Sequence, residues 1–181
     1  MNEELTFAVF GAGHGGQALT AYLSLKGFQV NLFNRTPERI NYIKLMGGLQ
    51  VEGEIQGFAP LTLVTSDIEE AVRGVKVIMV VVPATGHRYI AERMSNYLED
   101  GQIIVLNPGR TGGALEVKQV LKERECRAKV IIAEAQTFIF ASRISGPAQV
   151  RIFRIKNSVP VAAIPAHQTV EVVQTLRKAL P

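Results

Sequence analysis

Residues 7–18 read Phe-Ala-Val-Phe-Gly-Ala-Gly-His-Gly-Gly-Gln-Ala, and this stretch decides the fold. Four apolar residues, too few for a helix, run into a glycine cluster. An amphipathic helical pattern follows at once, with apolar residues at i, i+3, i+4 and i+7. The pattern predicts a strand, a tight turn and a helix. The turn holds the three glycines of a G-x-G-x-x-G motif, which are Gly11, Gly13 and Gly16.

Each glycine has its own role in such a turn. Gly11 permits the sharp bend after the strand, Gly13 lets a pyrophosphate approach the backbone, and Gly16 lets the helix pack closely on the sheet. Unpaired N–H groups and the positive end of the helix dipole then face the bound anion. We therefore predict a dinucleotide site rather than a purely structural turn, with His14 and Gly15 in the same loop. For His14, contact with a phosphate and exposure to solvent stay open as alternatives.

The choice of cofactor depends on the end of the second predicted strand, residues 29–33. Asn34 stands about 20 residues beyond the first glycine, where the residue that reads the ribose is expected. A carboxylate there would hold both ribose hydroxyls of NAD and repel a 2′-phosphate. Asn34 lacks that charge, whereas Arg35 and Thr36 can hydrogen-bond a phosphate, which favours NADP over NAD. The alternative is that Arg35 is a solvated surface residue and Asn34 still holds the ribose of NAD.

The length suits one domain, or one domain with a small appendage, and with the glycine motif we predict a dinucleotide-binding domain over residues 1–181. The net charge of +4 comes from scattered residues, which argues against a nucleic-acid surface and suits phosphorylated or carboxylate ligands. Cys126 is the only cysteine, which excludes a disulfide within the chain and gives no nucleophile context. We find no signal peptide, membrane span or metal-ligand spacing, so a reducing cytoplasm is the expected location.

Strands and helices alternate up to residue 133, which predicts an α/β fold with a doubly wound parallel sheet of the Rossmann type. The β-branched run Val75–Val82 is typical of a strand covered on both faces. Thr36 is expected to cap a helix that begins at Pro37. Residues 49–58 are expected to form a small hairpin or an irregular excursion. From residue 138 the rhythm changes. Three strands and a last helix are expected there, the strands forming an antiparallel extension on one edge: residues 138–142, 149–156 and 159–164, then 167–180.

Ligands of an open parallel sheet lie beyond the carboxyl ends of its strands. That rule places the nicotinamide side at two loops, although their prolines can also merely end strands and Asn107 can form an Asx turn. Glu134 and Thr137 follow a further strand; Glu134 is either a ligand for an amine or guanidinium or a structural salt-bridge partner. His87 and His167 are expected to be surface or capping residues. The nicotinamide-side residues are Val82, Pro83, Asn107 and Pro108.

Several stretches resemble the N-terminal domain of the opine dehydrogenases, a group that includes octopine, nopaline and N-(1-D-carboxyethyl)-L-norvaline dehydrogenases. The resemblance covers nearly the whole chain, and Asn107–Glu116 is its most specific part. It implies an NAD(P)H-dependent condensation of an α-keto acid with the amino group of an amino acid, through an imine that accepts the hydride. The stretches are residues 13–18, 21–27, 81–84, 106–116, 143–147 and 162–166.

The resemblance also implies where the ligands lie and what is absent. The pyrophosphate would lie on the glycines, the nicotinamide near Pro83 and Asn107, and the loop from Glu134 would face the substrate. Asn34 departs from the acidic residue of NAD-using members. Family members continue into an all-helical domain that supplies the catalytic histidine, whereas this chain ends at Pro181, about where that domain would begin. We therefore expect no catalytic residue in this chain, which alone should bind cofactor and turn over nothing.

Two other functions remain open from the sequence. One is a free-standing NAD(P)-binding module that senses cofactor without catalysis. The other is a relative that acts on glycerol phosphate or a hydroxy acid, and the lack of a lysine in the Asn107 loop counts against it. The sequence leaves undecided which amino acid and keto acid react, whether the chain is a fragment, and whether it forms a homodimer. No nucleic-acid or membrane partner is expected.

Overall fold

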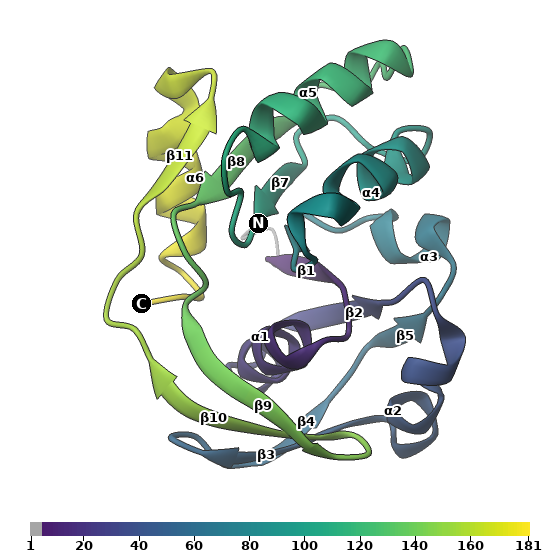
Figure 1. Cartoon of the computed structure of the whole chain (residues 1–181), viewed down its shortest axis with the longest axis vertical. Helices are drawn as coiled ribbons and strands as arrows, with labels where there is room; N and C mark the ends of the chain where they lie inside the picture. The colour runs from purple at the N-terminus through teal and green to yellow at the C-terminus, as the bar shows by residue number, and fades with distance from the viewer. Residues whose placement is uncertain (1–4) are drawn as a thin grey trace.

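The computed structural model describes residues 5–181, and its elements stack in layers (Figure 1). The larger sheet has seven strands in the order β11-β8-β7-β6-β1-β2-β5. All neighbours pair in parallel except β11, which runs antiparallel to β8. The parallel, doubly wound sheet and its antiparallel edge are confirmed. Its strands are β1 (Thr6–Phe10), β2 (Gln29–Phe33), β5 (Leu63–Thr65), β6 (Val77–Val80), β7 (Ile103–Leu106), β8 (Ile131–Ala135) and β11 (Val161–Ile164).

The helices cover both faces of this sheet. Helix α1 (His14–Leu25) packs on one face, and α3 (Ile68–Val72), α4 (His87–Met94) and α5 (Gly113–Glu123) pack on the other (Figure 1). The chain builds the sheet outward from β1 through β2 and β5, then returns to add β6, β7 and β8 on the other side. The strand order therefore reverses between β1 and β6, and the crevice beyond their carboxyl ends is the expected place for a ligand.

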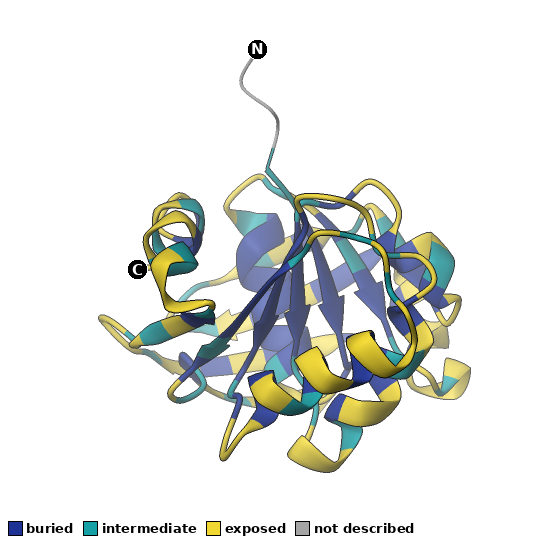
Figure 2. Ribbon diagram, turned by 90° about the horizontal axis from the view of Figure 1, so that it is seen from above, coloured by how far each residue is buried: buried dark blue, intermediate teal, exposed yellow. Residues whose placement is uncertain are grey.

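Both faces of the sheet carry core residues. Along β1, Phe7 and Val9 belong to the apolar cluster on the α1 side, whereas Ala8 and Phe10 belong to the cluster beneath α3, α4 and α5. Successive side chains of a strand point to opposite faces, so a sheet covered on both sides needs apolar residues at every position. The central strands are accordingly buried along their length (Figure 2). The uninterrupted run at 75–82 is explained in this way.

A second, four-stranded sheet covers the outer side of α1, in the order β4-β3-β10-β9. The predicted extension is therefore wrong in part, because only β11 joins the large sheet. Nine consecutive residues of α1 are buried, so this helix needs apolar cover all around, and the second sheet supplies it. The hairpin expected at 49–58 is confirmed as β3 and β4. The strands are β3 (Gly48–Gly53), β4 (Gly57–Pro60), β9 (Phe140–Gly146) and β10 (Gln149–Ile155).

The helix predicted to begin at Pro37 is broken. A 3-10 turn, η1 (Pro37–Arg39), precedes the short helix α2 (Asn41–Met46), and the side chain of Thr36 makes no capping hydrogen bond. Thr36 and Pro37 therefore stand at the predicted N-cap and first positions, but the side-chain cap expected of Thr36 is absent. Two further turns of this kind, η2 (Ala84–Gly86) and η3 (Ala166–Gln168), lead into α4 and α6 (Thr169–Leu176), so the last helix begins later than predicted.

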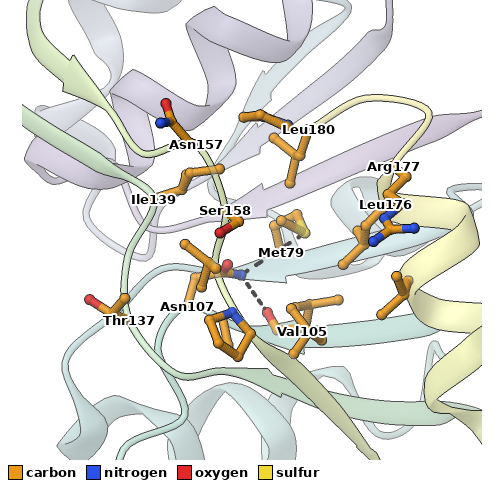
Figure 3. A pocket seen from close by; sticks show the side chains of 16 residues that line it. Met79, Val105, Asn107, Thr137, Ile139, Asn157, Ser158, Leu176, Arg177 and Leu180 are labelled. Carbon is orange, nitrogen blue, oxygen red and sulfur yellow. Dashed lines mark hydrogen bonds between the residues drawn. The ribbon is translucent and has the colours of Figure 1, made fainter.

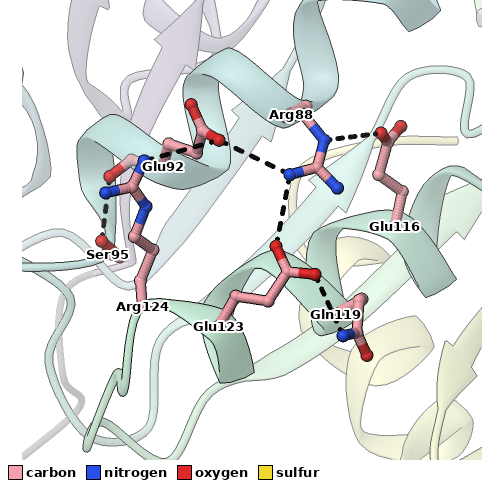
Figure 4. Close-up of polar contacts among 7 residues, drawn as sticks. All are labelled: Arg88, Glu92, Ser95, Glu116, Gln119, Glu123 and Arg124. Carbon is pink, nitrogen blue, oxygen red and sulfur yellow. Dashed lines mark hydrogen bonds and ion pairs between the residues drawn. The ribbon is translucent and has the colours of Figure 1, made fainter.

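Helices α4 and α5 are joined by a group of exposed charges (Figure 4). The guanidinium of Arg88 on α4 lies 3.3 Å from carboxylates of both Glu116 and Glu123 on α5. Hydrogen bonds from Gln119 and Arg88 hold the pKa of Glu123 below its usual value. Exposed ion pairs add little stability, so we assign this group to orienting the two helices. Among the described helices, none is long and apolar enough to cross a membrane.

Candidate dinucleotide site

Two of the three motif glycines are required by close packing. Gly11 has φ of +113°, and a Cβ there would overlap the carbonyl oxygen of Val81 and lie 3.0 Å from Cγ1 of Val82. Gly16 is buried, and a Cβ there would lie 2.7 Å from the carbonyl carbon of Gly11. Side chains are therefore excluded at both positions by neighbouring backbone, in agreement with the turn and packing roles that the motif predicts.

Gly13 differs from the other two glycines. It is exposed, its backbone is extended, and a Cβ there would meet nothing within 4 Å. The space beside it opens onto the N-terminus of α1, where no side chain caps the helix and no acidic residue stands in the first turn. The N–H groups of a first helical turn have no intrahelical acceptor, and the dipole makes this end positive. The turn is thus shaped and polarised for a pyrophosphate.

His14 and Gly15 connect this turn to the second sheet. Nδ1 of His14 accepts a hydrogen bond from the N–H of Ile144 at 3.0 Å, and Oγ of Ser142 donates to the His14 carbonyl at 3.1 Å. A Cβ at Gly15 would lie 2.8 Å from the ring of Phe138. The imidazole therefore has one nitrogen occupied by β9, and in the neutral ring the proton must be on Nε2.

Asn34 ties the end of β2 to the glycine turn. Its Oδ1 accepts from the N–H of Ala12 at 3.1 Å, and its Nδ2 donates to the carbonyl of Thr36 at 3.0 Å. An aspartate could accept the first bond but could not donate the second. The amide therefore has a structural role, and each of its two polar atoms can form one more hydrogen bond, for example to a ribose hydroxyl.

Arg35 is exposed beside this junction. Its guanidinium carbon lies 5.5 Å from the ring centroid of Tyr89, on α4. Arg35 takes part in none of the ion pairs formed by residues 5–181. Next to Asn34, where the cofactor ribose is expected, there is thus a positive charge that no carboxylate of residues 5–181 pairs with.

The nicotinamide-side residues follow the adjacent strands β6 and β7. Val82 is half-buried and lies close to the glycine turn, whereas Pro83 is exposed. Asn107 is buried, and its Nδ2 donates to the carbonyl of Val105 at 2.8 Å, which differs from the Asx turn considered as an alternative. Pro108 follows it and is half-buried. The topology therefore places both loops at one edge of the sheet.

A cavity of about 500 Å³ opens beside Asn107 and lies between the sheet and α6 (Figure 3). Its wall is mainly apolar, and Thr137 and Arg177 add polar groups. Of the residues predicted for the nicotinamide and substrate, Asn107 and Thr137 line this cavity, whereas the other four are not among its lining residues. The apolar part of the wall includes Met79, Val105, Ile139, Leu176 and Leu180.

Glu134 and Thr137 both have protein partners. Oε2 of Glu134 accepts from the N–H of Ala114 at 3.0 Å, in the first turn of α5. The carboxylate thus stabilises a helix N-terminus whose N-cap residue, Gly112, has no side chain to do so. Oγ1 of Thr137 accepts from Nζ of Lys156 at 3.0 Å. In place of the salt bridge considered for Glu134, its carboxylate accepts the hydrogen bond from the backbone N–H of Ala114.

His87 is buried, with only 1% of its surface exposed, so the expected surface position is wrong. Within the described chain, neither ring nitrogen has a hydrogen-bond partner. The ring packs on Gly113, where a Cβ would lie 3.0 Å from Nδ1. Burial lowers the pKa of His87, and the charges of Glu116 and Glu134 oppose this effect only in part. The neutral form is therefore favoured in the folded chain.

The buried histidine predicts a pH dependence of stability. Because its pKa is lowered on folding, the unfolded chain binds more protons below about pH 6.5, and the free energy of unfolding should fall as the pH drops through that range. A His87→Leu variant should lose less stability between pH 7.5 and 5.5, measured by urea unfolding. His167→Leu, at an exposed position, is the control and should follow the wild type. Parallel curves for all three proteins would contradict the assignment.

The glycine turn, the helix N-terminus and the reversal of strand order define the chain as a dinucleotide-binding domain of the Rossmann type. Residues 5–181 contain no group of three or more His, Cys, Asp or Glu side chains that could hold a metal ion. The family model for the N-terminus of NAD-dependent glycerol-3-phosphate dehydrogenase matches residues 6–134. The chain belongs to this family of N-terminal dehydrogenase domains.

Two curated relatives support this assignment. An opine dehydrogenase of Arthrobacter sp. (strain 1C) is 40% identical over 100% of this chain and 50% of its own length. A glycerol-3-phosphate dehydrogenase [NAD(P)+] of Moorella thermoacetica is 30% identical over 93% of this chain and 48% of its own length. The chain thus spans about half the length of the curated relatives it matches.

Solved structures agree on the fold. Octopine dehydrogenase with NADH and L-arginine superposes with a TM-score of 0.82 at 23% identity, covering 98% of this chain and 47% of that one. Yersinopine dehydrogenase with NADP+ gives a TM-score of 0.76 at 16% identity, covering 100% and 48%. The Rossmann fold with its second sheet is therefore shared with one enzyme solved with NADH and with another solved with NADP+.

Proposed function

We propose that the chain binds NADP(H) in preference to NAD(H). The proposal is carried by the pair Asn34 and Arg35. Asn34 stands where NAD-binding domains carry an acidic residue, and the neighbouring Arg35 forms no ion pair within residues 5–181. A guanidinium forms strong, paired hydrogen bonds with phosphate, and an amide does not repel it. Both cofactors occur among the related structures, one solved with NADP+ and another with NADH.

We further propose that the domain serves an enzyme that joins an α-keto acid to an amino acid by reducing their imine. The higher identity to an opine dehydrogenase than to a glycerol-3-phosphate dehydrogenase supports this substrate class. The cofactor supplies the hydride when bound. The chain itself binds the pyrophosphate at the glycine turn. It also positions the nicotinamide, beside Val82, Pro83, Asn107 and Pro108.

The cavity beside Asn107 supports the placement of the substrate side. Its apolar wall can exclude water from a reacting imine, and Thr137 offers a hydroxyl at its margin. Glu134 precedes Ala135, which lines the cavity, and one of its carboxylate oxygens accepts a hydrogen bond from the N–H of Ala114. We propose that Thr137 and Glu134 face the substrate. A reducing cytoplasm remains our proposed location, supported by the single cysteine, Cys126.

Titration of the chain with NADPH and NADH tests the cofactor proposal. Wild type should bind NADPH more tightly. Arg35→Gln should weaken NADPH binding by about tenfold or more, since a hydrogen bond to a charged group contributes about 1.5–3 kcal/mol, and should leave NADH nearly unchanged. Asn34→Asp should shift the preference toward NADH.

Arg127→Gln is the matched control. It removes the same charge from an exposed residue beyond the C-terminal end of α5, at the opposite edge of the sheet from the glycine turn. Binding should be unchanged in this variant. A preference for NADH that survives Arg35→Gln would end the NADP proposal, and failure to bind either cofactor at millimolar concentration would end the assignment of a working site.

A further inference from the structure

Tyr89 is the ring on which Arg35 lies, and sequence spacing does not reveal it. It stands in the first turn of α4, and the guanidinium carbon of Arg35 is 5.5 Å from its ring centroid. A cation within about 6 Å of an aromatic ring centroid is attracted by the ring face. The contact joins the loop after β2 to a helix on the other side of the strand-order reversal, so it crosses the expected adenosine end of the site.

The helix that carries Tyr89 is held firmly. Ile90, the next residue, is buried in the core beneath α4, and Arg88, the preceding residue, pairs with Glu116 and Glu123 on α5 (Figure 4). The ring therefore has a fixed base, although it is 37% exposed itself. A long arginine side chain lying on such a ring loses freedom before any ligand arrives, which lowers the entropic cost of binding.

Contact with the ring leaves the guanidinium chemically available. A salt bridge would occupy its N–H donors and neutralise its charge, whereas a cation–π contact uses no hydrogen-bond acceptor and leaves the donors free for a phosphate. Arg35 forms no ion pair in the described part of the chain, and its guanidinium lies near the Tyr89 ring instead. The arrangement holds a charged guanidinium, with N–H donors available to a ligand, next to Asn34.

We propose that Tyr89 is a specificity-determining residue that positions Arg35 for the 2′-phosphate of the cofactor. This inference rests on the proposed preference for NADP. Tyr89 acts through Arg35, so its effect should appear in NADPH binding and not in NADH binding. An aromatic ring is required at this position, and the phenol hydroxyl is not.

Binding constants for NADPH and NADH test the inference on the chain and its variants. Tyr89→Leu should weaken NADPH binding by about fivefold and change NADH binding less than twofold, whereas Tyr89→Phe should match the wild type. Tyr97→Leu is the control, because Tyr97 has the same exposed fraction of 37% and its ring is in none of the cation–π contacts formed within residues 5–181. In the Arg35→Gln background, Tyr89→Leu should have no further effect on NADPH binding.

The outcomes separate the inference from the proposed function. Equal losses for NADPH and NADH in Tyr89→Leu, or an unchanged NADPH affinity while Arg35→Gln loses it, would overturn the role of Tyr89 and leave the NADP preference standing. A further loss of NADPH binding when Tyr89→Leu is added to Arg35→Gln would also overturn it. If the wild type prefers NADH or binds neither cofactor, the proposed function fails, and the inference fails with it.

Discussion

Replacing Gly13 with valine should leave the chain folded and remove most of its affinity for NADPH and NADH. Gly13 is exposed, its φ of −78° and ψ of −172° suit any residue, and a Cβ there meets nothing within 4 Å. The fold therefore gains no clash. The added side chain would instead occupy the space through which a pyrophosphate must approach the first turn of α1.

The loss of affinity should be large. A phosphate hydrogen-bonded to backbone N–H groups gains about 1.5–3 kcal/mol from each charged contact, so losing two such contacts weakens binding by about 100-fold or more. Calorimetric titration measures the affinity, and thermal unfolding should show a midpoint within about 2 °C of the wild type, because substitutions at exposed positions change stability little.

A glycine outside the site provides the reverse control. Gly74 also has no atom within 4 Å of a built Cβ, but its φ is +69°, a conformation that side chains disfavour. Gly74→Ala should therefore lower the unfolding midpoint and leave cofactor binding intact. Normal cofactor affinity in Gly13→Val would show that no pyrophosphate lies on this turn.

The sequence was most informative where local pattern and tertiary environment agree. The run ending at Phe10, the glycines after it and the β-branched residues 75–82 predict β1, α1 and β6, because buried parallel strands need apolar residues on both faces. The placement of the glycine turn at the reversal of strand order follows from the alternation of strands and helices. These features depend on neighbours along the chain.

Other features depend on contacts between distant segments and left no local signal. The second sheet packs on the side of α1 that faces away from the large sheet. The amphipathic pattern of α1 predicts one buried face and does not reveal that the opposite face is also buried. His87 stands in a polar stretch at a helix start, yet the packing of α4 on Gly113 buries it. Thr36 stands at the N-cap position of the turn η1, but its side chain forms no capping hydrogen bond. Such contacts require the folded chain.

Several predicted residues gained a structural role that spacing could not show. His14 accepts a hydrogen bond from the backbone of β9, and Glu134 stabilises the start of α5. Both remain near the proposed ligands. Phe138, which the sequence placed in a strand, packs over Gly15 and so closes the turn from the side of the second sheet.

Replacing Gly16 with alanine should destabilise the whole domain together with the site. A Cβ at this buried position would overlap the carbonyl oxygen of Gly11 and lie 2.7 Å from its carbonyl carbon. Both partners are backbone, so no flexible side chain can move aside. Helix α1 would have to shift away from β1, and because it lies between two sheets, the shift would loosen its packing on the large sheet and crowd it against the second sheet. We expect a loss of about 3 kcal/mol or more.

The neighbouring glycine separates a backbone clash from a side-chain clash. A Cβ at Gly15 would meet the ring of Phe138 at 2.8 Å, and that ring is only half-buried and can move. Gly15→Ala should therefore cost much less than Gly16→Ala, and Phe138→Leu should restore part of its loss while doing nothing for Gly16→Ala. The unfolding midpoint of Gly16→Ala should fall by about 6–12 °C, measured by circular dichroism. A midpoint equal to that of Gly15→Ala would mean that α1 can move on the sheet, and the glycine would then be required only for the cofactor.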